Sequence, residues 1–271
     1  MGAMGLVIGT EVADAYPAQP LRLPARLRTF VAKAPDFLTP DIAGERRPTD
    51  ERMARYIRSF LIMRIVVGAL GVALPLWLVF GNLWLGGDLR DSLSSYYYSG
   101  VRELFVGVLC AIGVFLFTYK VAEHSLDNTL SIFAAVAVLA VALFPTGLPT
   151  GVAAPTPLQE KLGETSVERI HFSGAFVFIL SLAVISFLYG VREGRRPRQQ
   201  GKRSPRFWRW YHWGCAIFIA GALAGIGVDM LTEWGPNESL LIGEWVAVWA
   251  FGASWLMKGL ELDYLRNGAS A

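Results

Sequence analysis

The residues Glu164, Glu168 and His171 are the pattern in this sequence best suited to chemistry. Their spacing of four and then three positions puts the three side chains on one face of an α-helix. Carboxylate and imidazole groups together can hold a zinc, iron or manganese ion, or can act as an acid and base pair. A metal would need further ligands from elsewhere in the chain, and a single histidine where a helix begins is more often a hydrogen-bonding anchor. We therefore predict no metal and no cofactor.

Glu244 adds a second polar position, because it lies about 6 Å inside an apolar segment that begins near Leu240. An ionised carboxylate at that depth needs water or a partner. Arg102 and Arg169 are the available cations, so we predict a structural ion pair, with a functional acid or ligand as the alternative. The whole candidate cluster is Ser95, Tyr97, Arg102, Glu103, Glu164, Glu168, Arg169, His171, Asp229, Glu233 and Glu244.

A serine- and tyrosine-rich stretch, residues 92–98, precedes Arg102. Its polar and aromatic groups could grip a lipid headgroup or a sugar, but three tyrosines beside a membrane are also typical of an interfacial aromatic belt, which we favour. The catalytic residues stay unknown, since Gly-x-Ser-x-Gly, His-Glu-x-x-His and Cys-x-x-Cys are all absent from the sequence.

The elements that position these residues are predicted to be membrane-spanning helices. The chain has 271 residues, of which 54% are hydrophobic and only 17% charged, against roughly 25% charged in soluble domains. Six apolar segments approach the ~20 residues that a helix needs to cross a bilayer. They lie at residues 57–80, 102–120, 127–145, 168–190, 209–229 and 239–258. We expect an all-α, polytopic six-helix transmembrane bundle.

The positive charges predict the orientation of this bundle. With the N-terminus inside, 21 of the 25 Lys and Arg residues fall on the cytoplasmic side, as the positive-inside rule requires. Both termini are then cytoplasmic and the candidate cluster faces outward. Arg64, inside the first segment, is expected to snorkel to the interface. We predict three regions in a plasma-membrane protein: an extension over residues 1–56, the bundle over 57–258 and a tail over 259–271.

The basic stretches have membrane explanations. Residues 21–38 mix basic and apolar side chains and could form an interfacial helix, although Pro24 and Pro35 also allow a disordered tail. Residues 192–209 carry eight Lys and Arg, which a cytoplasmic loop requires, so we predict no nucleic-acid binding. Gly221 and Gly225 form a Gly-x-x-x-Gly pattern, for which tight packing inside the bundle is favoured over dimerisation.

Short motifs resemble known membrane families. Ser94-Ser95-Tyr96-Tyr97 with Arg102, Phe105 and Gly107, then Leu143-Phe144-Pro145-Thr146 and Ile170-His171-Phe172, resemble an uncharacterised bacterial and archaeal family of six-helix membrane proteins. The stretch before Arg102 and the His-Phe pair are more distantly similar to DRAM and Sfk-type membrane proteins. These resemblances imply a lipid-related or scaffold role and transfer no catalytic residue.

A zinc hydrolase of the alkaline ceramidase type is the other comparison that the residues invite, with Ser95, Asp127 and His171 as counterparts. The chain has three histidines and no His-x-x-x-His in its last apolar segment, so we do not expect that zinc centre. We expect membrane lipids as partners, with a membrane protein partner left open. A membrane-embedded enzyme acting on a lipid or headgroup at the external face, or a small transporter, is the alternative.

Overall fold

The computed structural model describes residues 51–118, 126–149, 154–194, 205–232 and 239–260, and all regular structure in these ranges is helical. This confirms the all-α prediction for the described part of the chain. The α-helices are α2 (Glu51–Trp84), α3 (Arg102–Thr118), α4 (Leu126–Leu143), α5 (Pro157–Leu162), α6 (Glu164–Glu193), α7 (Pro205–Thr232) and α8 (Ser239–Gly259), and a short 3-10 helix, η2 (Ser94–Tyr98), precedes α3.

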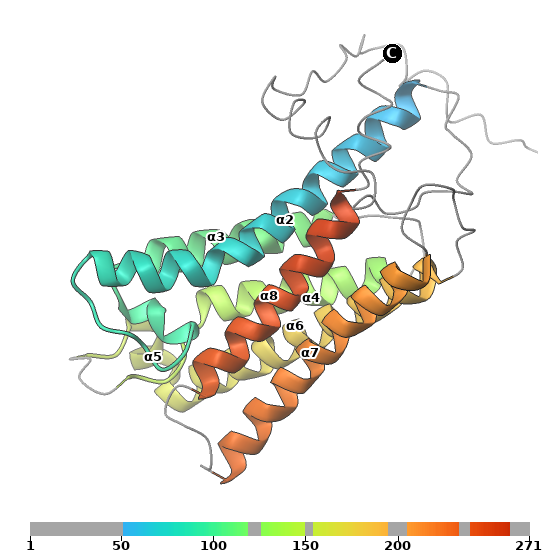
Figure 1. The fold of residues 1–271 in the computed structure, drawn as a ribbon. Coiled ribbons are helices and arrows are strands. Elements are labelled where there is room, and N and C mark those ends of the chain that lie inside the picture. Colours follow the sequence, from blue (N-terminus) through green and yellow to red (C-terminus); the bar gives the residue numbers. More distant parts are fainter. Residues whose placement is uncertain (1–50, 119–125, 150–153, 195–204, 233–238, 261–271) are drawn as a thin grey trace, which may run out of the picture.

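The six long helices form a closed ring (Figure 1). Each packs against the next along the chain, successive helices run in opposite directions, and α8 packs against α2 to close the ring. Helices η2 and α5 lie at one end, which we call the loop end. At the other end α2 begins, α6 ends, α7 begins and α8 ends; we call it the basic end, after Arg192 on α6 and Arg206 and Arg209 on α7.

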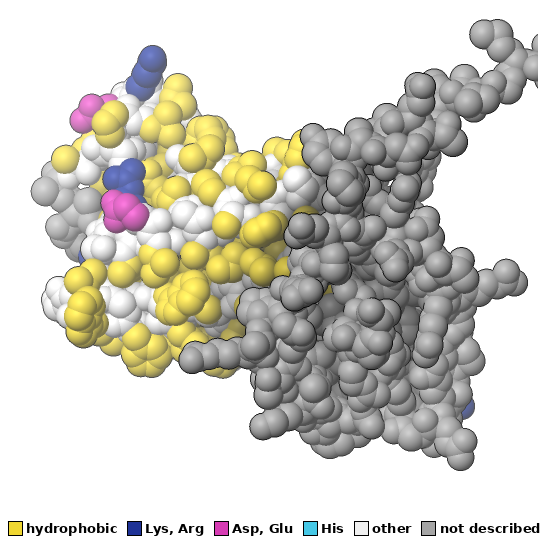
Figure 2. Space-filling model, turned by 90° about the horizontal axis from the view of Figure 1, so that it is seen from above, with side chains coloured by type: hydrophobic (Ala, Val, Ile, Leu, Met, Phe, Trp, Pro, Cys, Tyr) yellow, Lys and Arg dark blue, Asp and Glu magenta, His cyan; other side chains and the backbone are white. Residues whose placement is uncertain are grey.

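Four of the helices are long and apolar enough to cross a membrane on their own: Leu61–Trp84, Glu164–Glu193, Arg206–Thr232 and Ser239–Gly259. Helix α4 contains a shorter apolar helix, Asn128–Leu143, and α3 has 17 residues, about 26 Å at 1.5 Å per residue. Each apolar segment predicted from the sequence therefore overlaps a described helix. Hydrophobic side chains also cover much of the described surface visible in Figure 2, as a membrane-embedded surface requires.

Glycine lets α2 and α8 approach closely. A Cβ added to Gly68 would lie 2.6 Å from the backbone nitrogen of Leu256, and one added to Gly252 would lie 2.9 Å from the carbonyl oxygen of Gly68. The predicted tight packing at Gly221 and Gly225 is wrong, because added Cβ atoms there would meet nothing within 4 Å. Small residues permit close approach, but they do not determine which helix face meets a neighbour.

Candidate functional site

Glu244 joins α8 to the start of η2 at the loop end. Its carboxylate accepts hydrogen bonds from the backbone N–H of Leu93 at 2.5 Å and from the hydroxyl of Ser94 at 3.0 Å. In the same region the N–H of Leu241 donates to the carbonyl of Asp91 at 2.9 Å. The prediction that Glu244 needs a partner is confirmed, but the predicted ion pair with an arginine is wrong. The carboxylate instead binds N–H groups at a helix start, where the backbone dipoles favour negative charge.

The tyrosines of η2 are part of the protein interior. Tyr96 is fully buried and Tyr97 is 7% exposed, so the interpretation as an interfacial aromatic belt is wrong for both. The guanidinium of Arg102 donates to the Tyr97 hydroxyl at 2.6 Å and lies 4.3 Å from the ring centroid, a cation–π contact. Ser95 is also buried and exchanges hydrogen bonds with Ser92. These contacts fix the shape of residues 92–102.

Tyr98 connects η2 to the segment that follows α4. Its hydroxyl donates to the carbonyl of Thr146 at 2.7 Å and accepts from Nε2 of Gln159 at 2.8 Å. Burial raises the pKa of Tyr98 above its ordinary value. Gln159 was not among the predicted site residues. A Thr-x-x-Gln capping box with Thr156 holds it at the start of α5, and that pattern could have been recognised in the sequence.

The face formed by Glu164, Glu168 and His171 points at the same segment. Nδ1 of His171 lies 2.7 Å from the carbonyl oxygen of Phe144, and Glu164 accepts from the N–H of Leu148 at 3.0 Å. The Glu168 carboxylate lies against Gly147: a Cβ added to Gly147 would lie 2.6 Å from Oε1 of Glu168. The prediction that these three side chains share one helix face is confirmed, and all three contact residues 144–148. Among the described residues, no three His, Cys, Asp or Glu side chains gather to hold a metal ion.

The remaining candidates do not join this arrangement. Asp229, on α7, accepts a hydrogen bond from the hydroxyl of Ser239 on α8. Glu103 and Arg169 are exposed, and Glu233 lies outside the described residues. The cluster predicted as one site is therefore a set of contacts around η2, a set around residues 144–148, and Asp229 between α7 and α8.

A buried polar cluster at the basic end was not predicted. Nζ of Lys258 lies 2.7 Å from Oε1 of Glu193, with the two side chains 5% and 0% exposed. Nδ1 of the fully buried His212 lies 2.9 Å from the hydroxyl of Ser254. The first pair joins α8 to α6 across the ring, and the second joins α8 to the adjacent helix α7. One signal was available, since Ser254 and Lys258 are four residues apart and so share a helix face.

Arg64 belongs to the same end of the bundle. It is 8% exposed, and its guanidinium lies 5.7 Å from the centroid of the Tyr189 ring. The prediction that Arg64 snorkels to an exposed interface is wrong. Helix α2 begins at Glu51, which places Arg64 more than three turns inside the helix and against α6.

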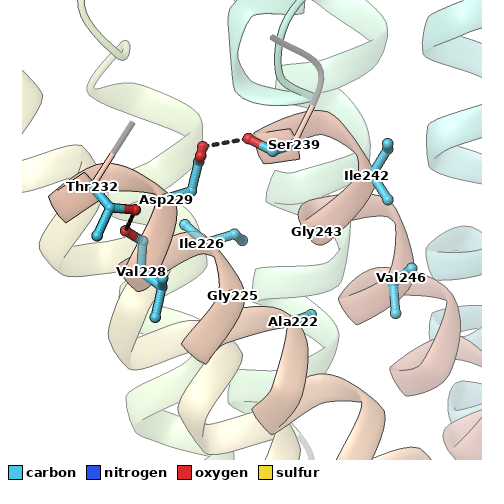
Figure 3. A pocket seen from close by; sticks show the side chains of 10 residues that line it. All are labelled: Ala222, Gly225, Ile226, Val228, Asp229, Thr232, Ser239, Ile242, Gly243 and Val246. Atoms are coloured by element: carbon cyan, nitrogen blue, oxygen red, sulfur yellow. Dashed lines mark hydrogen bonds between the residues drawn. The ribbon is translucent and has the colours of Figure 1, made fainter. Parts of the chain in front are cut away.

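An open apolar pocket of about 530 Å³ lies between α7 and α8 (Figure 3). Ala222, Gly225 and Ile226 line it from α7, and Ile242, Gly243 and Val246 from α8. Asp229, Thr232 and Ser239 are the polar residues in its lining, at the loop end. Helix α7 is the least covered of the four candidate spans, with 17% of its apolar window buried.

No family model, no curated protein and no solved structure matches this chain.

Proposed function

We propose that this chain is a multi-pass protein of the plasma membrane that interacts with lipids and has no catalytic activity. The observation that carries the proposal is the surface of α7. Ile217, Phe218 and Leu231 on this helix are 68%, 65% and 87% exposed, and the pocket beside α8 opens from the same helix. Apolar side chains so exposed require a hydrocarbon environment or a membrane protein partner.

The contacts at the loop end favour this proposal over an enzyme. A catalytic group must reach a substrate with its reactive atom. The carboxylates of Glu164 and Glu244 accept backbone N–H groups, and Nδ1 of His171 lies against a backbone carbonyl in a side chain that is 1% exposed. A lipid-related role is also what the resemblance to DRAM and Sfk-type membrane proteins implies.

Six crossings with cytoplasmic termini complete the proposal. Helices α3 and α4, with 17 and 18 residues, are about 26–27 Å long, close to the ~30 Å of a hydrocarbon core. Both lie in the ring between long apolar helices. An even number of crossings returns the chain to the side from which it started, and the charge of residues 192–209 assigns that side to the cytoplasm.

Epitope tags test the topology. A tag inserted at residue 198 should be protected from protease in intact cells, whereas a tag inserted at residue 152 should be cleaved. Cleavage of the first tag alone would refute the orientation, and cleavage of both would refute the number of crossings between them.

Lipid analysis tests the function. The protein purified in a mild detergent should retain lipids in proportions that differ from those of the membrane from which it was extracted. Proportions equal to those of the bulk membrane would refute a specific lipid interaction. Conversion of an added membrane lipid by the wild type, lost in His171→Ala, would refute the absence of catalysis.

A further inference from the structure

Two glycines of α6 make room for two side chains of α7 at the basic end. A Cβ added to Gly190 would lie 2.6 Å from Nε1 of Trp213, and one added to Gly194 would lie 2.7 Å from Cδ of Arg209. The two glycines are one turn apart on α6, and Arg209 and Trp213 are one turn apart on α7, so each pair shares a helix face. A larger residue at either glycine would displace the side chain that lies against it.

The guanidinium of Arg209 lies against two tryptophan rings. Its central carbon is 5.3 Å from the ring centroid of Trp213 and 5.9 Å from that of Trp210, and both are cation–π distances. The two indoles meet edge to face at 5.3 Å, and the Trp213 ring stacks on Phe187 of α6 at 5.6 Å. These contacts fix the guanidinium between α6 and α7.

This cationic group has donors and no acceptor in the described part of the chain. Nε of Arg209 and Nε1 of Trp213 are buried donors without a hydrogen bond, and no described carboxylate pairs with Arg209. Residues 194–228 contain seven Lys and Arg and no Asp or Glu, so the residues that join α6 to α7 can add positive charge but no carboxylate. A buried donor without an acceptor is costly, and an anion would supply both the acceptor and the opposite charge.

The position of Arg209 along α7 corresponds to the headgroup region of a bilayer. From Trp213 to Thr232, the last residue of α7, the helix rises about 29 Å, which matches the ~30 Å of a hydrocarbon core. Arg209 lies one turn before Trp213, and the exposed Arg206 lies a further turn out. Tryptophan is enriched at this depth, so the anion that fits here is one carried by the membrane surface.

An exposed apolar strip continues from this group along the same face of α7. Positions 210, 217, 221 and 224 lie within about 60° of one another around the helix. Trp210 and Ile217 are 61% and 68% exposed, and Gly221 and Ala224 are exposed as well. A Cβ added to Gly221 would meet nothing within 4 Å, so the small residues leave room for an acyl chain beside Ile217.

From this arrangement we propose that Arg209, with Arg206 beside it, binds the phosphate of an anionic phospholipid of the cytoplasmic leaflet, whose acyl chain lies along Ile217, Gly221 and Ala224. The inference rests on the proposed lipid interaction and names its ligand class. Guanidinium groups donate paired, charge-assisted hydrogen bonds to phosphate, and Lys and Arg clustered beside a membrane-spanning helix attract anionic lipids. A choline or ethanolamine headgroup would bring a cation toward the two arginines.

The contact with Gly194 also gives Arg209 a structural role. Gly194 is the C-cap of α6, and Nη1 of Arg209 lies 3.3 Å from the position of its added Cβ. A positive charge near a helix C-terminus is favourable. A role confined to stability predicts that replacing Arg209 leaves the choice of lipid unchanged, whereas a lipid site predicts that the choice is lost. Lipid preference is therefore the measurement that separates the two.

Native mass spectrometry of the delipidated full chain in detergent tests the inference. The protein is titrated with phosphatidylglycerol, phosphatidylcholine and phosphatidylethanolamine that share the same acyl chains. We expect phosphatidylglycerol to bind first, preferred about tenfold or more over the two zwitterionic lipids. Arg209→Gln should abolish this preference, and Arg206→Gln should reduce it about threefold or more. Glycerol 3-phosphate should not displace the lipid, because it lacks the acyl chains.

Lys161→Gln is the matched control, because it removes one positive charge from an exposed position at the loop end. It should keep the preference of the wild type, and circular dichroism should show that the variants are folded. If Arg209→Gln does not fold, Arg206→Gln decides the test, since its side chain is exposed.

The outcomes separate this inference from the lipid function on which it rests. Equal, saturable binding of the three lipids by the wild type would overturn the anionic preference and leave the lipid interaction standing. A full preference in both arginine variants would overturn this site, and displacement by glycerol 3-phosphate would assign it to a soluble phosphate. A dimer that Ile217→Ala dissociates, without saturable lipid binding, would assign the strip to a second copy. No saturable binding of any lipid would overturn both proposals.

Discussion

Replacing one member of the Glu193–Lys258 pair should destabilise the bundle more than any exposed substitution. The carboxylate and the ammonium group lie 2.7 Å apart, and their side chains are 0% and 5% exposed. Lys258→Met removes the ammonium group and leaves the Glu193 carboxylate buried, and Glu193→Met does the converse. Breaking a buried pair in this way costs about 3–5 kcal/mol of the free energy of unfolding.

The double substitution Glu193→Met/Lys258→Met should cost far less than the two single substitutions together. Two methionines of similar length fill the space with apolar atoms and remove both charges of the pair, and such replacements of buried pairs are often close to neutral. The coupling free energy between the two sites should therefore exceed about 2 kcal/mol. Salt should change it little, because screening acts weakly on buried charges.

The assay is reversible unfolding in mixed micelles of a mild detergent and sodium dodecyl sulfate, followed by tryptophan fluorescence. Lys161→Met serves as the control, because Lys161 is exposed on α5 and should change the free energy of unfolding by no more than about 0.5 kcal/mol. The assignment of a tightly coupled buried pair would be refuted if each single variant had a free energy of unfolding within about 1 kcal/mol of the wild type. It would also be refuted if the losses of the two single variants simply added in the double variant.

Three further predictions test the packing and the loop end. Gly68→Ala should cost about 1–3 kcal/mol, since its Cβ would lie 2.6 Å from the Leu256 backbone, while Gly221→Ala should be neutral or stabilising in the same assay; equal effects would contradict the α2–α8 contact. Glu244→Ala should speed deuterium exchange at the amides of Leu93 and Ser94, which lose their acceptor; unchanged exchange would contradict the contact between Glu244 and the start of η2. Burial raises the pKa of Tyr98 from its ordinary value of 10.0, so its contribution to stability is complete below about pH 10 and is lost as the pH rises through the raised pKa. The melting temperature of Tyr98→Phe should therefore fall less steeply above pH 10, although the loss of two hydrogen bonds lowers it at pH 7.

The long helices were predictable because hydrophobicity over about 20 residues is a strong signal. The predicted first segment, 57–80, corresponds to α2, Glu51–Trp84, and the sixth, 239–258, to α8, Ser239–Gly259. The signals for η2 and α5 are weaker, because these helices have only five and six residues. Helices this short depend on tertiary contacts rather than on their own propensity.

The partners of the site residues were harder to predict than the residues themselves. The depth of Glu244 correctly indicated that it needs a partner, but every residue carries a backbone N–H, so no residue type marks Leu93 as the donor. The same holds for Phe144, whose carbonyl lies against His171. The glycines present the converse case, because Gly68 packs closely and Gly221 does not, although both lie in apolar helices.

Helix α8 explains why lipid binding and stability should respond to different substitutions. Three contacts fix it in the ring: Glu244 at the loop end, Gly252 against α2 and Lys258 at the basic end. On α7, Ile226 packs closely against Gly243, but Gly225 beside it faces open space. A substitution in one of the three contacts should therefore lower the free energy of unfolding. If the proposed lipid interaction holds, a substitution at Gly225 should instead change the lipids that the purified protein retains, in a bundle that stays folded.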